Sequence, residues 1–118
     1  MVDQSFPKRN RLKTEEDFQR VYEEGKKQVN NYFVIYGREN DRGIPRIGLV
    51  TSRSLGKAVE RNRVKRMLRE AFRKNKSLFD FYDIVVIPRE TVTSLHHKNI
   101  EREFLNTIQR MTSSNQEG

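Results

Sequence analysis

Residues 58–74 constrain the fold of this chain more than any other segment. Apolar residues recur there at intervals of three and four positions, which places them on one face of an α-helix: Val64, Met67, Leu68, Ala71 and Phe72. The opposite face carries Asn62, Arg66, Arg69 and Arg73. A helix of this length spans roughly 25 Å. The segment therefore predicts one long helix that packs an apolar face against a core and presents a basic face.

The basic face of this helix carries charge of almost one sign. Seven of the residues from 61 to 74 are Lys or Arg, and Glu70 is the one acid among them. Basic residues on an amphipathic helix often form only a solvated face. A solvated face normally mixes signs, however, because opposite charges four positions apart stabilise a helix. Since like charges repel, this face favours an anionic partner such as a nucleic acid.

The composition narrows the class of partner. The chain has 118 residues, a net charge of +8 and a pI near 10.0, which points to nucleic acid or an anionic membrane. Apolar runs such as 84–87 are far shorter than the roughly 20 residues of a membrane span, so no membrane partner is expected. Cysteine is absent, which excludes disulfides and thiolate metal sites. Because no signal peptide is recognisable either, a cytoplasmic location is expected.

The other elements predict a single small α+β domain, a sandwich of helices packed on a small mixed sheet. Thr14 is typical of an N-cap and Gly25 of a helix stop, so a helix is expected over about 14–24. Strands are predicted at 31–36, 46–51 and 83–87, with a short extra strand near 26–29, and a last helix begins within 94–99 and ends at about Met111. The ends are predicted as a basic N-terminal arm, 1–13, and a flexible polar tail, 112–118.

Three expectations concern the sheet itself. The turn signal at 40–43 predicts that strands 31–36 and 46–51 form a hairpin. Alternation in the first strand puts Phe33 and Ile35 on one face, and Tyr32, Val34 and Tyr36 on the other. The wholly apolar strand at 83–87 is expected to be central and covered on both faces.

The residues offer no catalytic constellation. His96 and His97 are adjacent, so on a helix they point about 100° apart and make a poor pair of metal ligands. The acids are scattered and suggest no two-metal nuclease site. What remains is recognition. Phe18, Tyr22 and Tyr36 either belong to the core or line a groove in which bases of single-stranded RNA stack.

One motif makes the chain recognisable. Residues 48–70 contain Arg61-Asn62-Arg63-x-Lys65-Arg66-x-x-Arg69-Glu70, and upstream stand Arg9-Asn10-Arg11-Leu12 and Asp17-Phe18. This pattern resembles the signature of the bacterial ribonuclease P protein subunit, and the resemblance extends over residues 8–111. It implies an αβββαβα fold with a left-handed βαβ crossover, against the general rule of right-handed crossovers.

The resemblance also implies a function. The protein would be the small subunit of a ribonucleoprotein endonuclease that removes the 5′ leader of precursor tRNA. Its partners would be the ribonuclease P RNA subunit and the leader, with no obligate protein partner. Catalysis would belong to the RNA and to Mg²⁺ ions bound mainly by that RNA. No catalytic residue, cofactor or tightly bound metal is therefore expected on the protein.

Family roles carry over to matching positions. The leader cleft would comprise Phe18, Tyr22 and Tyr36, with Ser52 and Arg53 in the loop before the motif. The motif helix would contact RNA through Arg61, Asn62, Arg63, Lys65, Arg66 and Arg69, with Asn62 and Lys65 at the rim of the cleft. The basic arm contributes Arg9 and Arg11. The chain departs from the common pattern at Ser54 and Lys57, where the family often has Lys and Asn.

Three other classes of protein fit the residues less well. A structural RNA-binding protein, such as a small ribosomal protein, shares the basic composition but not the Arg-Asn-Arg motif. A DNA-binding regulator requires a helix-turn-helix, whereas strands flank the basic helix here on both sides. A protein-only nuclease requires the carboxylate cluster that the sequence does not offer.

Overall fold

A computed structural model describes residues 8–79 and 81–117, with side chains as far as Thr112. Its helices are α1 (Glu15–Glu24), α2 (Ala58–Lys74) and α3 (His97–Glu117), and its strands are β1 (Lys26–Val29), β2 (Phe33–Glu39), β3 (Arg46–Leu49) and β4 (Tyr82–Pro88). The predicted αβββαβα order and the α+β class are confirmed. The basic helix has the predicted bounds, and the short strand near 26–29 is present as β1.

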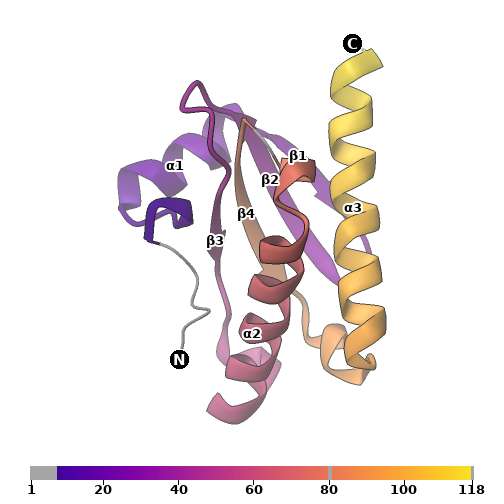
Figure 1. Cartoon of the computed structure of the whole chain (residues 1–118). Coiled ribbons are helices and arrows are strands. Elements are labelled where there is room, and N and C mark those ends of the chain that lie inside the picture. The colour runs from indigo at the N-terminus through magenta and orange to yellow at the C-terminus, as the bar shows by residue number, and fades with distance from the viewer. Residues whose placement is uncertain (1–7, 80, 118) are drawn as a thin grey trace.

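The four strands form one mixed sheet in the order β1-β2-β4-β3. β2 is antiparallel to both β1 and β4, and β3 is parallel to β4. In Figure 1, α1 lies on one side of the sheet, while α2 and α3 stand side by side in front of the other. The apolar strand β4 is central, as its sequence predicted, and is buried from Asp83 to Val86, but Ile87 on the α1 face is only partly covered.

The predicted hairpin between 31–36 and 46–51 is wrong. β4 lies between β2 and β3, so these strands are not neighbours. β3 instead pairs with β4, in a register that sets Ile47 beside Ile84. The physical reason is that a wholly apolar strand gains most when both of its edges are paired and both of its faces are covered.

The path from β3 through α2 to β4 is a crossover between parallel strands. In Figure 1, β3 and β4 both run downward, α2 stands in front of them, and β4 lies to the right of β3. This arrangement is left-handed, as the family resemblance implied and contrary to the usual hand. It brings the start of α2 to the end of β3, on the edge of the sheet.

The strand β2 begins later than predicted. The Asn30 side chain accepts hydrogen bonds from the backbone N–H groups of Tyr32 and Phe33, at 2.9 and 2.8 Å, and this turn delays the strand to Phe33. Tyr32 therefore leaves the predicted alternation and packs against the same cluster as Phe33. Within β2, Tyr36 faces α1 while Phe33 and Ile35 face the opposite side.

Both predicted ends also differ. The last helix continues to Glu117 instead of ending at about Met111, because residues 112–117 contain neither Gly nor Pro to stop it. At the other end, residues 8–13 lie against the sheet edge and are not an extended arm. Leu12 is buried and its N–H donates to the Ile47 carbonyl at 3.0 Å. Residues 1–7 of the predicted arm and residue 118 of the predicted tail lie outside the described residues.

The sheet separates two apolar clusters. The larger one lies between the sheet and α2 and α3, and includes the stacked rings of Phe79 and Phe104. The smaller one lies between the sheet and α1, with Leu12, Val21 and Val85 buried at its centre. Because α1 has only ten residues, it covers only part of its face of the sheet.

A buried ion pair joins three elements beneath α1. Arg46 of β3 donates from Nε and Nη2 to the two carboxylate oxygens of Asp83 in β4, at 2.9 and 2.7 Å. Its Nη1 lies 3.5 Å from an oxygen of Asp17 in α1. The sequence pattern gave no sign of this contact between Asp17 and Arg46. None of the described helices is long and apolar enough to cross a bilayer.

Candidate nucleic-acid interface

Three aromatic side chains gather on the α1 face of the sheet, and we call them the aromatic cleft: Phe18, Tyr22 and Tyr36. The rings of Tyr22 and Tyr36 meet edge to face, with centroids 5.0 Å apart. Burial, together with the neighbouring Tyr36, raises the pKa of Tyr22 above its ordinary value, so its phenol stays neutral. All three rings are only partly buried. The structure thus brings together the three aromatics that were predicted to line a groove.

Phe18 is held by a close contact with the sheet. Its ring lies over Gly48 of β3, where a Cβ would come within 2.5 Å of the ring's Cζ atom. Only glycine leaves room for this approach. Gly48 was not predicted as a site residue, although a glycine inside a strand often marks such a close approach.

The sheet face beside the rings is only partly covered. Ile87 of β4 and Val50 just after β3 face α1, and Val34 of β2 shares this face because it is paired with Ile87. Each of these three side chains is partly exposed. Val29 of β1 is 47% exposed. The result is an apolar strip next to the aromatic rings, suited to flat, apolar faces such as those of unpaired bases.

Charged groups of α2 differ in their partners. Arg63 pairs with Glu60 at 3.2 Å, and Arg73 pairs with Glu70 at 2.7 Å. Arg61 donates from Nη1 to the Gly56 carbonyl at 2.8 Å. The charges of Arg63 and Arg73 are thus partly neutralised by acidic side chains of the same helix.

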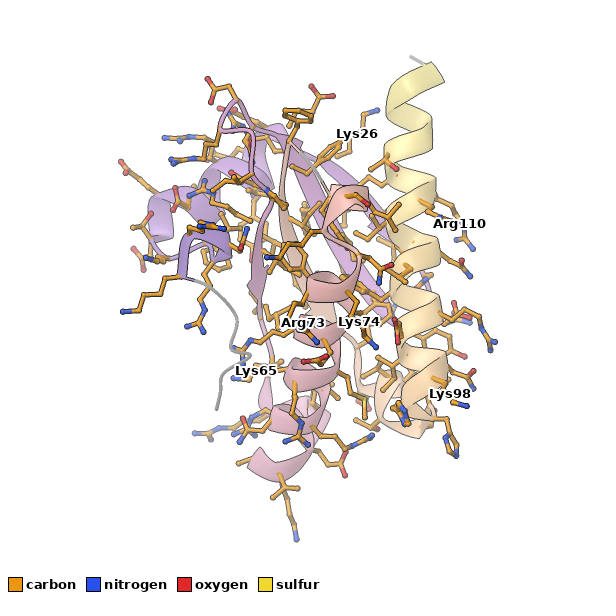
Figure 2. The ribbon with its side chains drawn as sticks, viewed as in Figure 1. Lys26, Lys65, Arg73, Lys74, Lys98 and Arg110 are labelled. Atoms are coloured by element: carbon orange, nitrogen blue, oxygen red, sulfur yellow. The ribbon has the colours of Figure 1, made fainter. Side chains whose placement is uncertain are left out.

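Other polar groups of α2 are open to an outside partner. Within the described residues, the side chains of Asn62, Lys65 and Arg66 have no hydrogen-bond or ion-pair partner, and Asn62 and Arg66 are exposed. In Figure 2, Lys65 lies on the side of α2 toward β3, whereas Lys74 lies on the side toward α3. These open groups are therefore candidates for binding phosphates.

The N-terminal segment joins the basic face of α2. Burial, with a further contribution from the nearby charge of Arg11, lowers the pKa of Arg69. The backbone of Arg11 forms an isolated β-bridge with Ile47 at the edge of β3. Arg9 is exposed in the short turn before it. Two guanidinium groups close enough to affect each other are stabilised by an anion between or beside them.

The loop before α2 lies next to the uncovered sheet face. Ser52 and Arg53 are part of it, and follow Val50 by two and three residues. Both side chains are exposed. The Ser52 and Ser54 hydroxyls are 2.6 Å apart. These two predicted site residues therefore lie at the end of the strip, between the aromatic cleft and the start of α2.

The described side chains that could bind a metal ion are not clustered at this surface. In the part of the chain that the structure describes, no three His, Asp or Glu side chains are placed to hold a metal ion together. His96 and His97 are exposed, with ring centroids 6.4 Å apart, at the start of α3.

One further cation, Lys27, lies at the cleft and was not predicted there. It stands in β1 directly opposite Tyr36, and its Nζ lies 5.7 Å from the centroid of the Tyr36 ring. The sequence did predict a short strand at 26–29. It did not reveal the register of that strand with β2, and this register is what places Lys27 beside Tyr36.

Known proteins share this sequence and this arrangement. The Ribonuclease P family profile matches residues 6–112. The ribonuclease P protein component of Thermotoga maritima is 38% identical over 93% of this chain and 98% of its own length, and that of Alkaliphilus oremlandii is 37% identical over 90% and 94%.

Solved structures agree with the sequence matches. A ribonuclease P protein mutant of Staphylococcus aureus superimposes with a TM-score of 0.79 at 34% identity, covering 92% of this chain and 90% of its own. The Thermotoga maritima ribonuclease P protein superimposes with a TM-score of 0.77 at 38% identity, covering 85% and 96%. The motif, the fold and these matches agree, and the chain belongs to the family of bacterial ribonuclease P protein components.

Proposed function

We propose that this chain binds two RNAs, the ribonuclease P RNA subunit and the 5′ leader of precursor tRNA, and so promotes removal of the leader. Family membership makes it a subunit of an endoribonuclease ribonucleoprotein. The observation that carries the finer proposal is the adjacency of two unlike surfaces. A partly exposed apolar and aromatic strip lies on one face of the sheet, and a basic helix rises beside the β3 edge.

The leader is the RNA that suits the aromatic cleft. Unpaired bases stack on aromatic rings, and each stacked base contributes about 1–3 kcal/mol. Phe18, Tyr22 and Tyr36 offer such rings over a strip that α1 leaves uncovered. Ser52 and Arg53 at the end of the strip are placed for the phosphates of the same strand. A paired RNA would not expose its bases to this surface.

The RNA subunit is the partner that suits the motif helix and the N-terminal segment. Arg66 is exposed on α2, and Arg61 and Arg69 are partly exposed there. Arg9 and Arg11 continue the charge onto the β3 edge. Arginine binds phosphate in a two-point geometry and keeps its charge. Asn62 and Lys65 are assigned to the rim of the cleft, whereas Arg63 completes the motif on the side of the helix that it shares with Lys74.

Catalysis is assigned to the RNA. The described residues do not provide a set of metal ligands, so no reaction step is attributed to Mg²⁺ on the protein. We propose that the Mg²⁺ ions of the holoenzyme are bound mainly by the RNA subunit. The protein's positive charge would offset repulsion between two RNAs and reduce the Mg²⁺ concentration that the complex needs. The proposed location of the complex is the cytoplasm.

Cleavage of a precursor tRNA that carries a 5′ leader, at low Mg²⁺, tests this function. The protein, a bacterial ribonuclease P RNA, and the two together are compared. Cleavage that requires both establishes a subunit that acts on an RNA catalyst. Cleavage by the protein alone would overturn the assignment of catalysis to RNA. Tight RNA binding with no effect on cleavage would favour a structural RNA-binding role.

A further inference from the structure

Lys27 is a charged side chain that the motif does not include. In the antiparallel pair of β1 and β2 it is directly opposite Tyr36, so the two side chains share one face of the sheet. The Lys27 ammonium lies 5.7 Å from the centroid of the Tyr36 ring, within the range of a cation–π contact. Lys27 is exposed. It therefore belongs to the aromatic cleft by geometry.

The neighbouring lysine lies on the other face. Lys26 is opposite Gly37, and a Cβ at Gly37 would meet the Met111 side chain of α3. Alternation along β1 thus directs Lys26 toward α3 and Lys27 toward α1. In Figure 2, the label of Lys26 stands near α3. The chain consequently contains its own control, two adjacent lysines with the same charge on opposite faces.

Lys27 also lies at the far edge of the cleft from α2. β1 and β3 are the two edges of the four-stranded sheet, about 14 Å apart at the usual strand spacing. The basic groups of α2 and of the N-terminal segment lie at the β3 edge. At the β1 edge the end of α1 is acidic, with Glu23 exposed and Glu24 paired to Arg38 at 2.7 Å. An RNA strand that crosses the cleft needs a cation there.

We propose that Lys27 binds a phosphate of the precursor tRNA leader at the β1 edge, beside the base that stacks on Tyr36. The proposal rests on the leader-binding function proposed above and extends the leader path across the whole sheet. A base that stacks on the Tyr36 ring takes the place of the ammonium. The flexible lysine stem allows the ammonium to move from the ring to the adjacent phosphate, where the charge-assisted hydrogen bond is stronger.

Affinity measurements on the reconstituted holoenzyme test this role. Its Kd is measured for a precursor tRNA with a leader and for the same tRNA without one, over a range of salt concentrations. The variants are Lys27→Gln, Lys27→Arg, Lys26→Gln and Tyr36→Ala. Urea unfolding of each protein checks that folding is retained.

The expected result is specific to Lys27 and to the leader. Lys27→Gln weakens binding of the leader-bearing tRNA about two- to five-fold, the range of an exposed ion pair. It also reduces the log–log salt slope by about 0.7, the value of one phosphate contact on a single strand. Binding of the leaderless tRNA is unchanged, Lys27→Arg behaves as wild type, and Lys26→Gln has no leader-dependent effect.

Several results would overturn the role of Lys27. One is wild-type affinity of Lys27→Gln for the leader-bearing tRNA. Others are an equal loss with Lys26→Gln, or an equal loss for leaderless tRNA, since either indicates a general charge effect. Weaker binding with an unchanged salt slope would mean that Lys27 only positions the Tyr36 ring and does not bind a phosphate. If wild type itself does not distinguish the two tRNAs, and Tyr36→Ala changes nothing, the proposed leader binding fails as well.

Discussion

The ring of Phe18 in α1 lies against the backbone of Gly48 in β3, so closely that a Cβ at Gly48 would be 2.5 Å from the ring's Cζ. Cβ atoms in proteins essentially never come so close to another heavy atom. This contact sets how near α1 approaches the sheet. It therefore sets the height of the Phe18 ring above β3, on the same face of the sheet as Tyr36.

Replacing Gly48 with Ala is expected to destabilise the protein and to disturb the cleft. The added methyl group forces the Phe18 ring outward, and overpacking of this kind costs about 1–3 kcal/mol. Urea unfolding measures the cost, and binding of a leader-bearing tRNA measures the effect on the cleft. The Phe18→Ala variant supplies the control, because Gly48→Ala should cost less in that background. Equal costs in both backgrounds would show that the ring is not the obstacle.

The buried ion pair predicts a larger effect. Asp83→Asn leaves the buried Arg46 guanidinium with only the more distant Asp17 carboxylate, 3.5 Å away. Removing one partner of a buried pair costs about 3–5 kcal/mol, whereas an exposed pair contributes about 0–1 kcal/mol. Glu24→Gln, which removes the exposed partner of Arg38, is the matched control. Similar unfolding free energies for the two variants would contradict a structural role for the Arg46–Asp83 pair.

Prediction from the sequence was accurate where periodicity is strong and local. The helix at 58–74 has the predicted bounds because its apolar residues recur at helical spacing from Val64 to Phe72, between basic ends. The pairing of β3 could not be predicted in the same way, since it depends on β4, which follows more than thirty residues later. Alternation could place Tyr36 on the face opposite Phe33, but its contact with α1 required the packed structure and its partner Lys27 required the register of β1.

Charge alone predicted the positions of the basic residues less well. Arg46 looks like any other basic residue in the sequence, yet its side chain is buried beside Asp83. The sequence places Arg42 in a turn and Arg46 in a strand, but it does not indicate that the second guanidinium is buried and paired while the first side chain is exposed. Asp17 likewise has two roles, since it belongs to the first turn of α1 and also approaches Arg46. Only the packed structure separates the basic residues that stabilise the fold from those that are open to RNA.

The pH dependence of stability should include a contribution from Asp17. Burial raises the pKa of this carboxyl, but Arg46 and hydrogen bonds from Thr14 and Lys13 outweigh it, so the folded-state pKa lies below the ordinary 3.8. A lowered pKa stabilises the folded state above 3.8, and this stability is lost as pH falls through the folded-state value. Unfolding free energies between about pH 6 and about pH 2.5 should therefore fall more steeply for wild type than for Asp17→Asn. Parallel curves would count against this assignment.

The basic face of α2 predicts the salt dependence of RNA binding. Replacing Arg66 and Arg69 together with Ala should weaken binding of the RNA subunit broadly and flatten the log–log slope, by about 0.7–0.9 for each phosphate that the variant no longer binds. Replacing Lys98 and Arg110 with Ala removes the same charge from the outer side of α3 (Figure 2) and is the control. Equal slopes for the two double variants would indicate that only net charge matters.

The aromatic cleft predicts effects that depend on the leader. Phe18→Ala or Tyr36→Ala should each weaken binding of a leader-bearing precursor by about 1–3 kcal/mol, the usual contribution of a stacked base, and leave binding of leaderless tRNA unchanged. Tyr36→Phe keeps the ring and should retain affinity. Phe81→Ala removes an aromatic ring that is 57% exposed and outside the cleft, so it controls for a general loss of apolar surface. Wild-type affinity of both alanine variants for the leader-bearing precursor would exclude stacking in this cleft, and the leader would then have to bind through its phosphates alone.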